Sequence, residues 1–191
     1  MNSEEATHII VSVVTISIAF SILFSGTTDF SPEFATTFIK VFFAVGLGFV
    51  LHELAHKYVA QSYGAFAEYR SWTTGLILAV VMAVFVGFVF AAPGAVYIYG
   101  PHLSKEKNGR IALAGPLTNL LLALGFILLG FALPEFSGFA KFGASVNAFL
   151  GVFNLLPFYP LDGHKVYDWS PRAWGFSMLV LILVLINSYG A

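Results

Sequence analysis

Long apolar runs separated by short polar stretches dominate the pattern of residues along this chain. Six runs are apolar enough to form helices in a membrane: 8–25, 32–63, 75–92, 111–133, 143–156 and 174–189. A helix of about 20 apolar residues spans the hydrocarbon core of a bilayer. The pattern therefore predicts an all-α polytopic membrane protein with about six apolar helical segments, folded as a single domain over residues 1–191.

The second run carries the clearest helix boundaries. Ser31 is a preferred N-cap residue, Pro32 suits the first helical turn, and Gly64 suits the position just after a helix. A helix that runs from Pro32 to Tyr63 is about 47 Å long, which exceeds a bilayer core of ~30 Å. We therefore expect one long helix whose end reaches beyond the apolar core.

Two stretches break the helical pattern. Residues 65–74 are polar and are predicted to form a connection. Residues 94–112 begin with β-branched and aromatic residues and then become charged, with Asn108-Gly109 as a turn signal. They predict a small insert, either a β-hairpin or another sheet-like structure rather than a helix, that contains a charged loop at 105–110.

Composition agrees with a membrane protein and removes several other classes. Hydrophobic residues make up 58% of the 191 residues and charged residues only 10%, whereas soluble domains carry about 25% charged residues. The lipid bilayer is therefore an expected partner. A formal net charge of −1, without a basic patch or a nucleotide-binding motif, excludes a typical nucleic-acid-binding protein. No basic residue precedes the first run, so we expect that run to be retained as a span rather than removed as a signal peptide.

The candidate chemistry lies in the second run, where residues 52–56 fit the pattern H-E-x-x-H. Positions i and i+4 share one face of a helix, so His52 and His56 can bind one metal ion. Glu53 is close enough to accept a proton from water activated by that metal without being a ligand. Since the chain has no cysteine, a metal site must use His, Asp or Glu. The motif predicts zinc-dependent hydrolysis; the alternative is a buried polar cluster that joins helices.

A catalytic zinc site needs a third protein ligand beside the two histidines. Most acidic residues of the chain lie near its start, at helix caps or in polar loops. Asp162 differs, because it follows an apolar segment that Pro157 and Pro160 interrupt. Prolines unwind membrane helices only where protein or a cavity satisfies the freed backbone. Asp162 is therefore the candidate third ligand, although spacing alone leaves open that it caps the helix or turn that follows.

Three motifs, in this order along the chain, resemble the site-2 protease family of zinc intramembrane metalloproteases, of the short prokaryotic type without a PDZ or CBS domain. They are H-E-x-x-H at residues 52–56, G-P-x-x-N at 115–119 and N-x-x-P-x-x-P-L-D-G at 154–163. The match covers most of the chain from the second apolar run to Asp162. The resemblance implies that His52, His56 and Asp162 bind Zn²⁺ and that Glu53 is the general base.

The resemblance also implies that Asn119 and Asn154 lie near the cleft and contact the substrate. Members of the family hydrolyse peptide bonds in or near transmembrane segments of membrane-anchored proteins, in regulated intramembrane proteolysis. A substrate helix must unwind before it is cut, and residues 95–99 either supply a strand edge that holds it extended or form a simple interfacial hairpin. Two other functions remain open: a metal transporter, and a non-catalytic relative that binds membrane helices.

The ligands of one metal must lie at one depth, which limits how the runs cross the membrane. If 75–92 makes no net crossing, the basic residues divide unevenly between the two faces. One face then carries Lys57, Arg70, Lys105, Lys107, Arg110, Lys165 and Arg172, and the other Lys40 and Lys141. The positive-inside rule favours this arrangement over strict alternation. We therefore expect five net crossings, a location in the plasma membrane of a prokaryote, and an active site toward the cytoplasm.

Overall fold

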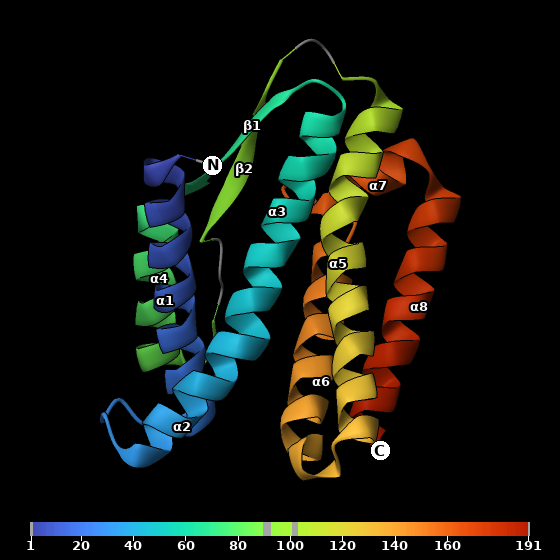
Figure 1. The fold of residues 1–191 in the computed structure, drawn as a ribbon. Coiled ribbons are helices and arrows are strands. Elements are labelled where there is room, and N and C mark those ends of the chain that lie inside the picture. The colour runs from blue at the N-terminus through green and yellow to red at the C-terminus, as the bar shows by residue number, and fades with distance from the viewer. Residues whose placement is uncertain (1, 90–92, 101–102, 191) are drawn as a thin grey trace. The chain divides into compact units, whose positions relative to one another are not determined.

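The structure, a computed structural model, describes residues 2–89, 93–100 and 103–190. Within these residues the chain is mainly helical and contains one two-stranded sheet (Figure 1). Four of the described helices are long and apolar enough to cross a membrane: Ser3–Ser25, Pro32–Ser62, Lys105–Ala132 and Pro171–Ser188. The prediction of a helical protein with several candidate membrane spans is confirmed to this extent.

The contacts of the chain divide it into two compact units. One unit consists of Met1–Val50 with Glu68–Tyr97, and the other of Leu51–Ala67 with Ile98–Ala191. Each unit is built from segments that are distant in sequence. A single functional domain over residues 1–191 stays a prediction.

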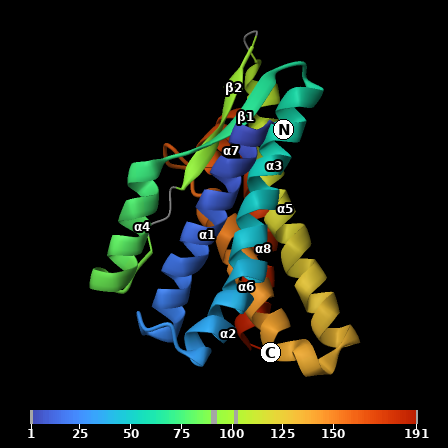
Figure 2. The ribbon, with the colours of Figure 1, turned by 60° about the vertical axis from the view of Figure 1, so that its left-hand side comes forward.

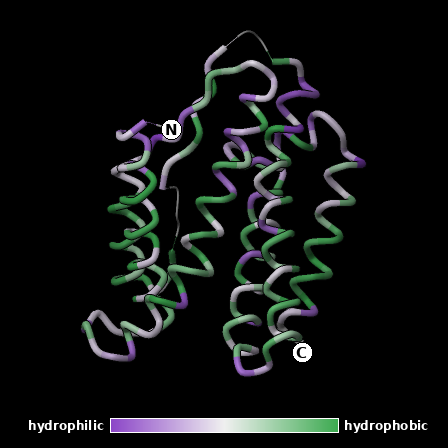
Figure 3. The backbone as a smooth tube through the Cα atoms, in the orientation of Figure 1, coloured by the Kyte–Doolittle hydropathy of each residue, from purple (hydrophilic) through white to green (hydrophobic). Residues whose placement is uncertain are grey.

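The first unit is organised around α1 (Ser3–Ser25). The Asn2 side chain accepts a hydrogen bond from the Glu5 backbone N–H at 2.7 Å and caps the start of the helix. α1 packs against α2 (Pro32–Val41) and α4 (Thr73–Val86), and Figure 3 shows hydrophobic residues along α1 and α4. Small side chains let apolar helices approach each other closely. Those buried in this cluster are Ala19, Ala79 and Ala83.

The predicted long helix is present, but it contains an unexpected π turn. The Ser31 hydroxyl accepts the Phe34 N–H at 3.2 Å, and Gly64 adopts a positive φ of 80° after the last turn, so the predicted start and stop are confirmed. Between α2 and α3 (Leu47–Ser62) lies a π-helical turn at Phe42–Gly46. The extra residue of a π turn rotates the side chains that follow by about 100°. The face on which the H-E-x-x-H motif lies therefore depends on this turn.

The second unit contains four further helices. They are α5 (Lys105–Ala132), α6 (Ser137–Asn154), α7 (Asp162–Trp169) and α8 (Pro171–Gly190). α5 packs against the other three, and α8 also packs against α6 and α7 (Figure 1, Figure 2). One core cluster joins α5, α7 and α8 to Leu155, the residue that follows α6, through Ala112, Val166 and Leu181. The apolar packing of α6 and α7 holds the loop between them in place.

The predicted β-hairpin at 94–112 is wrong in its pairing. A strand forms at β2 (Gly94–Tyr99), but its partner is β1 (Phe66–Ser71), in the stretch predicted to be a polar connection. The strands are antiparallel, because Gly94 lies against Arg70 while Gly100 lies against Ala65. Residues 101–102 of the predicted hairpin lie outside the described residues. The pairing joins strands on either side of α4, which local turn signals cannot reveal.

The predicted charged loop at 105–110 is also wrong, since these residues begin α5. The Ser104 hydroxyl accepts the Lys107 N–H at 3.2 Å and caps the helix. Glu106 in the first turn interacts favourably with the helix dipole, and its carboxylate lies 2.6 Å from the guanidinium of Arg110, one turn later. The cap and this ion pair outweigh the turn tendency of the asparagine and glycine between them.

Two predicted apolar segments correspond to helices that are not among the four candidate spans of the described residues. α4 has 14 residues, which makes it about 21 Å long and shorter than a bilayer core of ~30 Å. The last part of that predicted run, 90–92, lies outside the described residues. α6 takes the place of the predicted run at 143–156. The count of six membrane segments stays a prediction.

Candidate metal centre

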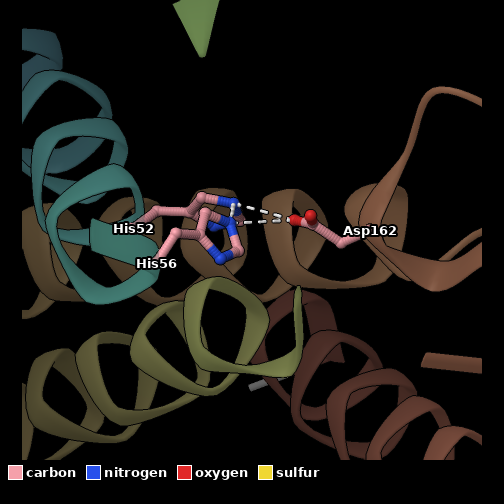
Figure 4. Close-up of side chains that lie close together, drawn as sticks. All are labelled: His52, His56 and Asp162. Carbon is pink, nitrogen blue, oxygen red and sulfur yellow. Dashed lines mark hydrogen bonds and ion pairs between the residues drawn. The ribbon is translucent and has the colours of Figure 1, made fainter. Parts of the chain in front are cut away.

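The three predicted metal ligands come together in the second unit. His52 and His56 lie one turn apart on α3, and Asp162 is the first residue of α7. Figure 4 shows both imidazoles directed toward the Asp162 carboxylate. The two Nε2 atoms are 3.0 Å apart, and they lie 3.2 Å (His52) and 3.1 Å (His56) from Asp162 Oδ2. Both histidines are buried, whereas the Asp162 side chain keeps 15% of its exposure.

The Nδ1 atom of each histidine forms a hydrogen bond with an oxygen atom. His52 Nδ1 lies 2.6 Å from Asn119 Oδ1, and His56 Nδ1 lies 2.7 Å from the carbonyl oxygen of Ile111. A carbonyl oxygen only accepts hydrogen bonds, so each Nδ1 carries a proton, and Nε2 is the nitrogen of each ring that faces Asp162. Metal-binding histidines are oriented in this way.

The separations between the donor atoms fit a tetrahedral zinc ion. Zinc binds histidine nitrogen and carboxylate oxygen at about 2.0–2.2 Å, which places two donor atoms of a tetrahedron about 3.3–3.6 Å apart. The observed separations of 3.0 to 3.2 Å come close to this value. Three protein donors leave a fourth position for water or substrate, as in catalytic zinc sites.

The charge of the third residue also suits a cation. Burial raises the pKa of the Asp162 carboxyl, but the charge of His56 and hydrogen bonds from both histidines lower it by more. The pKa therefore lies well below its ordinary range, and the carboxyl is an anion at neutral pH. Metal binding requires ligands in this deprotonated form.

The end of α6 holds Asp162 in place. Leu161, not Asp162, occupies the N-cap position of α7, so the alternative role of Asp162 as a cap is not what the structure contains. Gly163 packs directly on the backbone of Leu155, where a Cβ atom would collide with the carbonyl oxygen. Trp174 Nε1 donates a hydrogen bond to that same carbonyl at 2.7 Å. The glycine after the aspartate thus allows the close approach that sets the carboxylate beside the histidines.

The absence of a side chain at Gly115 on α5 leaves space for the two imidazole rings. A Cβ atom at this position would lie 2.5 Å from Nε2 of both His52 and His56. Non-bonded atoms do not approach so closely in a packed interior. The glycine of the G-P-x-x-N motif is therefore required because the α5 backbone lies against the rings.

The other predicted site residues take different places. Glu53 follows His52 on α3 and is half-buried. Asn119 lies beside His52, and its amide forms hydrogen bonds with His52 and with Asn147. Asn154 is the last residue of α6, and its amide donates to the Leu150 carbonyl at 2.9 Å. The base role of Glu53 and the substrate contacts of the two asparagines stay predictions.

Two participants were missed by reasoning from the sequence. The Ile111 carbonyl that orients His56 has no sequence signal, because every residue carries a carbonyl. Asn147 did have one, since an amide in an apolar segment must find a partner or pay for its burial. It is completely buried and bonded to Asn119.

Comparisons with known proteins agree with this geometry. A Methanocaldococcus jannaschii protein that carries a zinc metalloprotease name, MJ0611, is 43% identical over 185 residues, which is 95% of this chain and 92% of the relative. The similarly named YwhC of Bacillus subtilis is 28% identical and matches 75% of this chain and 80% of its own length. Rip2 of Mycolicibacterium smegmatis, also named as a zinc metalloprotease, is 29% identical over 78% of this chain and 69% of its own.

No protein-family model matches the chain, and no solved structure matches it. Family membership therefore rests on the relatives together with the three motifs and the geometry of the histidines and Asp162. Similarity of 43% that extends over almost the whole of both chains is enough to assign it. The chain belongs to the site-2 protease family of zinc metalloproteases.

Proposed function

We propose that this protein is a zinc-dependent intramembrane endopeptidase, which hydrolyses peptide bonds in or near transmembrane segments of membrane-anchored proteins. The observation that carries the proposal is the place of the histidine pair. His52 and His56 lie on Pro32–Ser62, a helix long and apolar enough to cross a membrane, and His52 is about 30 Å from its start. Ionisable residues within a membrane-spanning helix are rare and usually have a function.

In this proposal His52, His56 and Asp162 hold the zinc ion and Glu53 is the general base. Bound zinc supplies a Lewis acid for the scissile carbonyl and makes water more acidic. Glu53 removes the proton from the attacking water and later delivers it to the leaving amine. The burial of both histidines restricts access to bulk water, which strengthens the electrostatic interactions of the ligands.

The two-stranded sheet supports a way of presenting the substrate. Peptide bonds of a helix are shielded by their own hydrogen bonds, so a substrate segment must become extended before hydrolysis. In the described residues each strand has one strand neighbour, and the exposure of β2 alternates along its length. We propose that an unwound substrate segment adds to the outer edge of β2 through backbone hydrogen bonds.

The experiment that tests the proposed function maps the cleavage site. Purified protein is incubated in detergent with a model protein that has a single transmembrane segment, and mass spectrometry identifies the new termini. We expect the new termini within that segment or a few residues from it. Cleavage confined to soluble flanking sequence would contradict the intramembrane activity. Absence of cleavage of several such substrates, with zinc bound, would favour a non-catalytic helix-binding protein.

We also propose that the whole chain acts as one protease domain in a prokaryotic plasma membrane, with five net crossings and the active site toward the cytoplasm. The distribution of basic residues supports this orientation. The shortness of α4 supports the absence of a net crossing there.

Single cysteines can test the orientation, because the natural chain contains none. Lys107 in the first turn of α5 and Lys141 in α6 are both exposed, and the 28-residue α5 separates them. In intact cells, a membrane-impermeant maleimide is expected to label Lys141→Cys at once and Lys107→Cys only after lysis. The cysteine-free protein is the control. The reverse labelling pattern would refute the cytoplasmic site.

A further inference from the structure

A chain of buried amides runs from His52 to the backbone of α6. Asn119 Oδ1 accepts the His52 Nδ1–H at 2.6 Å, and Asn119 Nδ2 donates to Asn147 Oδ1 at 3.1 Å. Asn147 Nδ2 then donates to the Gly143 carbonyl at 2.9 Å. Asn119 is 1% exposed and Asn147 is not exposed. Water therefore does not compete for these groups.

The Gly143 carbonyl sets the donor-to-acceptor direction of every hydrogen bond in this series. The Gly143 carbonyl can only accept a hydrogen bond, so Asn147 must turn its NH₂ group toward it and its oxygen toward Asn119. That oxygen also only accepts, so Asn119 must present its own NH₂ group to Asn147 and its oxygen to His52. His52 is left with the proton on Nδ1. Rotating either amide by 180° would oppose two donors or two acceptors in a buried place.

The two histidines are therefore oriented by different means. His56 donates directly to a backbone carbonyl, that of Ile111, which no substitution removes. His52 depends on two side chains, of which only Asn119 touches it. This makes the orientation of His52 sensitive to a residue that is separated from it by another side chain.

We infer that Asn147 is a positioning residue of the zinc site, which acts through the Asn119 amide to hold His52 with its Nε2 lone pair toward the metal. The inference rests on the proposed function, in which His52 binds zinc. Outer partners of metal-binding histidines contribute about 10–100-fold to metal affinity. Asn147 exerts this effect by fixing the orientation of an amide rather than by direct contact.

The test measures zinc affinity of the purified full chain by competition with a chromophoric chelator. Asn147→Leu keeps the side-chain size but removes both hydrogen bonds, and we expect zinc to bind about 10–100-fold more weakly. Asn147→Asp keeps an oxygen directed at Asn119, and its buried carboxyl, in the protonated form, can still donate to the Gly143 carbonyl. It is therefore expected to retain most of the affinity. Equal losses in both variants would overturn the inference.

Testing Asn147→Leu in a second variant, Asn119→Asp, shows whether Asn147 positions His52 or has only a general structural role. In Asn119→Asp, a carboxylate faces His52 and accepts its Nδ1–H in either rotamer, so it needs no partner to orient it. Adding Asn147→Leu to this background is expected to change zinc affinity by no more than about twofold, the scatter of independent sites. If Asn147→Leu weakens zinc binding as much here as in the natural protein, Asn147 acts through general packing and the inference is wrong.

Two controls complete the design. Asn187→Leu makes the same substitution at an asparagine that also donates to a carbonyl four residues back, that of Leu183, and it is expected to leave zinc affinity unchanged. His52→Ala tests the underlying assignment. Normal zinc binding by His52→Ala would refute the proposed ligand set. If His52→Ala loses zinc but Asn147→Leu binds it with unchanged affinity, only the role of Asn147 is refuted.

Discussion

Replacing Glu53 with glutamine is expected to abolish peptide hydrolysis while zinc binding stays intact. Glutamine has nearly the shape of glutamate but cannot take a proton from water, so the reaction loses its general base. General base catalysis contributes about 10²–10⁴-fold to the rate of an enzyme, and the cleavage rate should fall by at least this factor. The measurements are initial cleavage rates on a single-span substrate and the zinc content of the same purified protein.

The matched control is Glu106→Gln, which makes the same change at an exposed glutamate in the first turn of α5. It removes an ion pair with Arg110, and exposed pairs of this kind contribute little to stability. Its cleavage rate should equal that of the natural protein. Persistent cleavage by Glu53→Gln at a comparable rate would show that another group is the base. Loss of zinc from Glu53→Gln would mean that the glutamate supports the metal site instead.

Gly115→Ala is expected to lose zinc although position 115 contributes no ligand. The added Cβ atom would lie 2.5 Å from Nε2 of both His52 and His56, so the rings or α5 must shift by about 1 Å to reach an ordinary contact. Zinc–ligand distances tolerate deviations of only about 0.2 Å. We therefore expect a loss of zinc affinity of about 100-fold or more, beyond the range for an outer partner of a ligand. Chelator competition measures it.

Gly125→Ala is the control on the same helix, because a Cβ atom at Gly125 meets nothing within 4 Å. It should bind zinc normally, and it should stabilise α5 by about 0.5–1 kcal/mol, since alanine is a better helix former than glycine. Asp162→Ala removes a proposed ligand, so its zinc affinity shows how large the loss is when a whole donor group is deleted. Normal zinc affinity in Gly115→Ala would show that the metal does not bind between these histidines.

Part of this protein could be predicted from residues that are close together in the chain. The long apolar runs indicated membrane helices because span length follows from bilayer thickness. The ends of the long helix followed from Ser31 and Gly64, whose side chain and backbone act on adjacent groups. The spacing of His52 and His56 placed both on one helical face, since the α-helix itself sets that geometry.

Two predictions from turn and strand signals failed, one because of local contacts in the first helical turns and one because of a distant partner strand. The sequence 105–110 has the composition of a turn, but a serine cap and an ion pair make it the start of α5. The strand at 94–99 was recognisable, but its partner at 66–71 lies on the other side of a helix. No pattern within either strand specifies that pairing.

Which residues stand around the histidines was decided by packing between segments far apart in the chain. Asp162 is 110 residues from His52, and its place depends on the close contact between Gly163 and Leu155. The sequence pattern predicted Asp162 as a ligand but did not exclude a capping role, because both roles place a carboxylate after an interrupted helix. Periodicity and caps reflect interactions within one or two turns, whereas the donor set of a metal site depends on how whole helices pack.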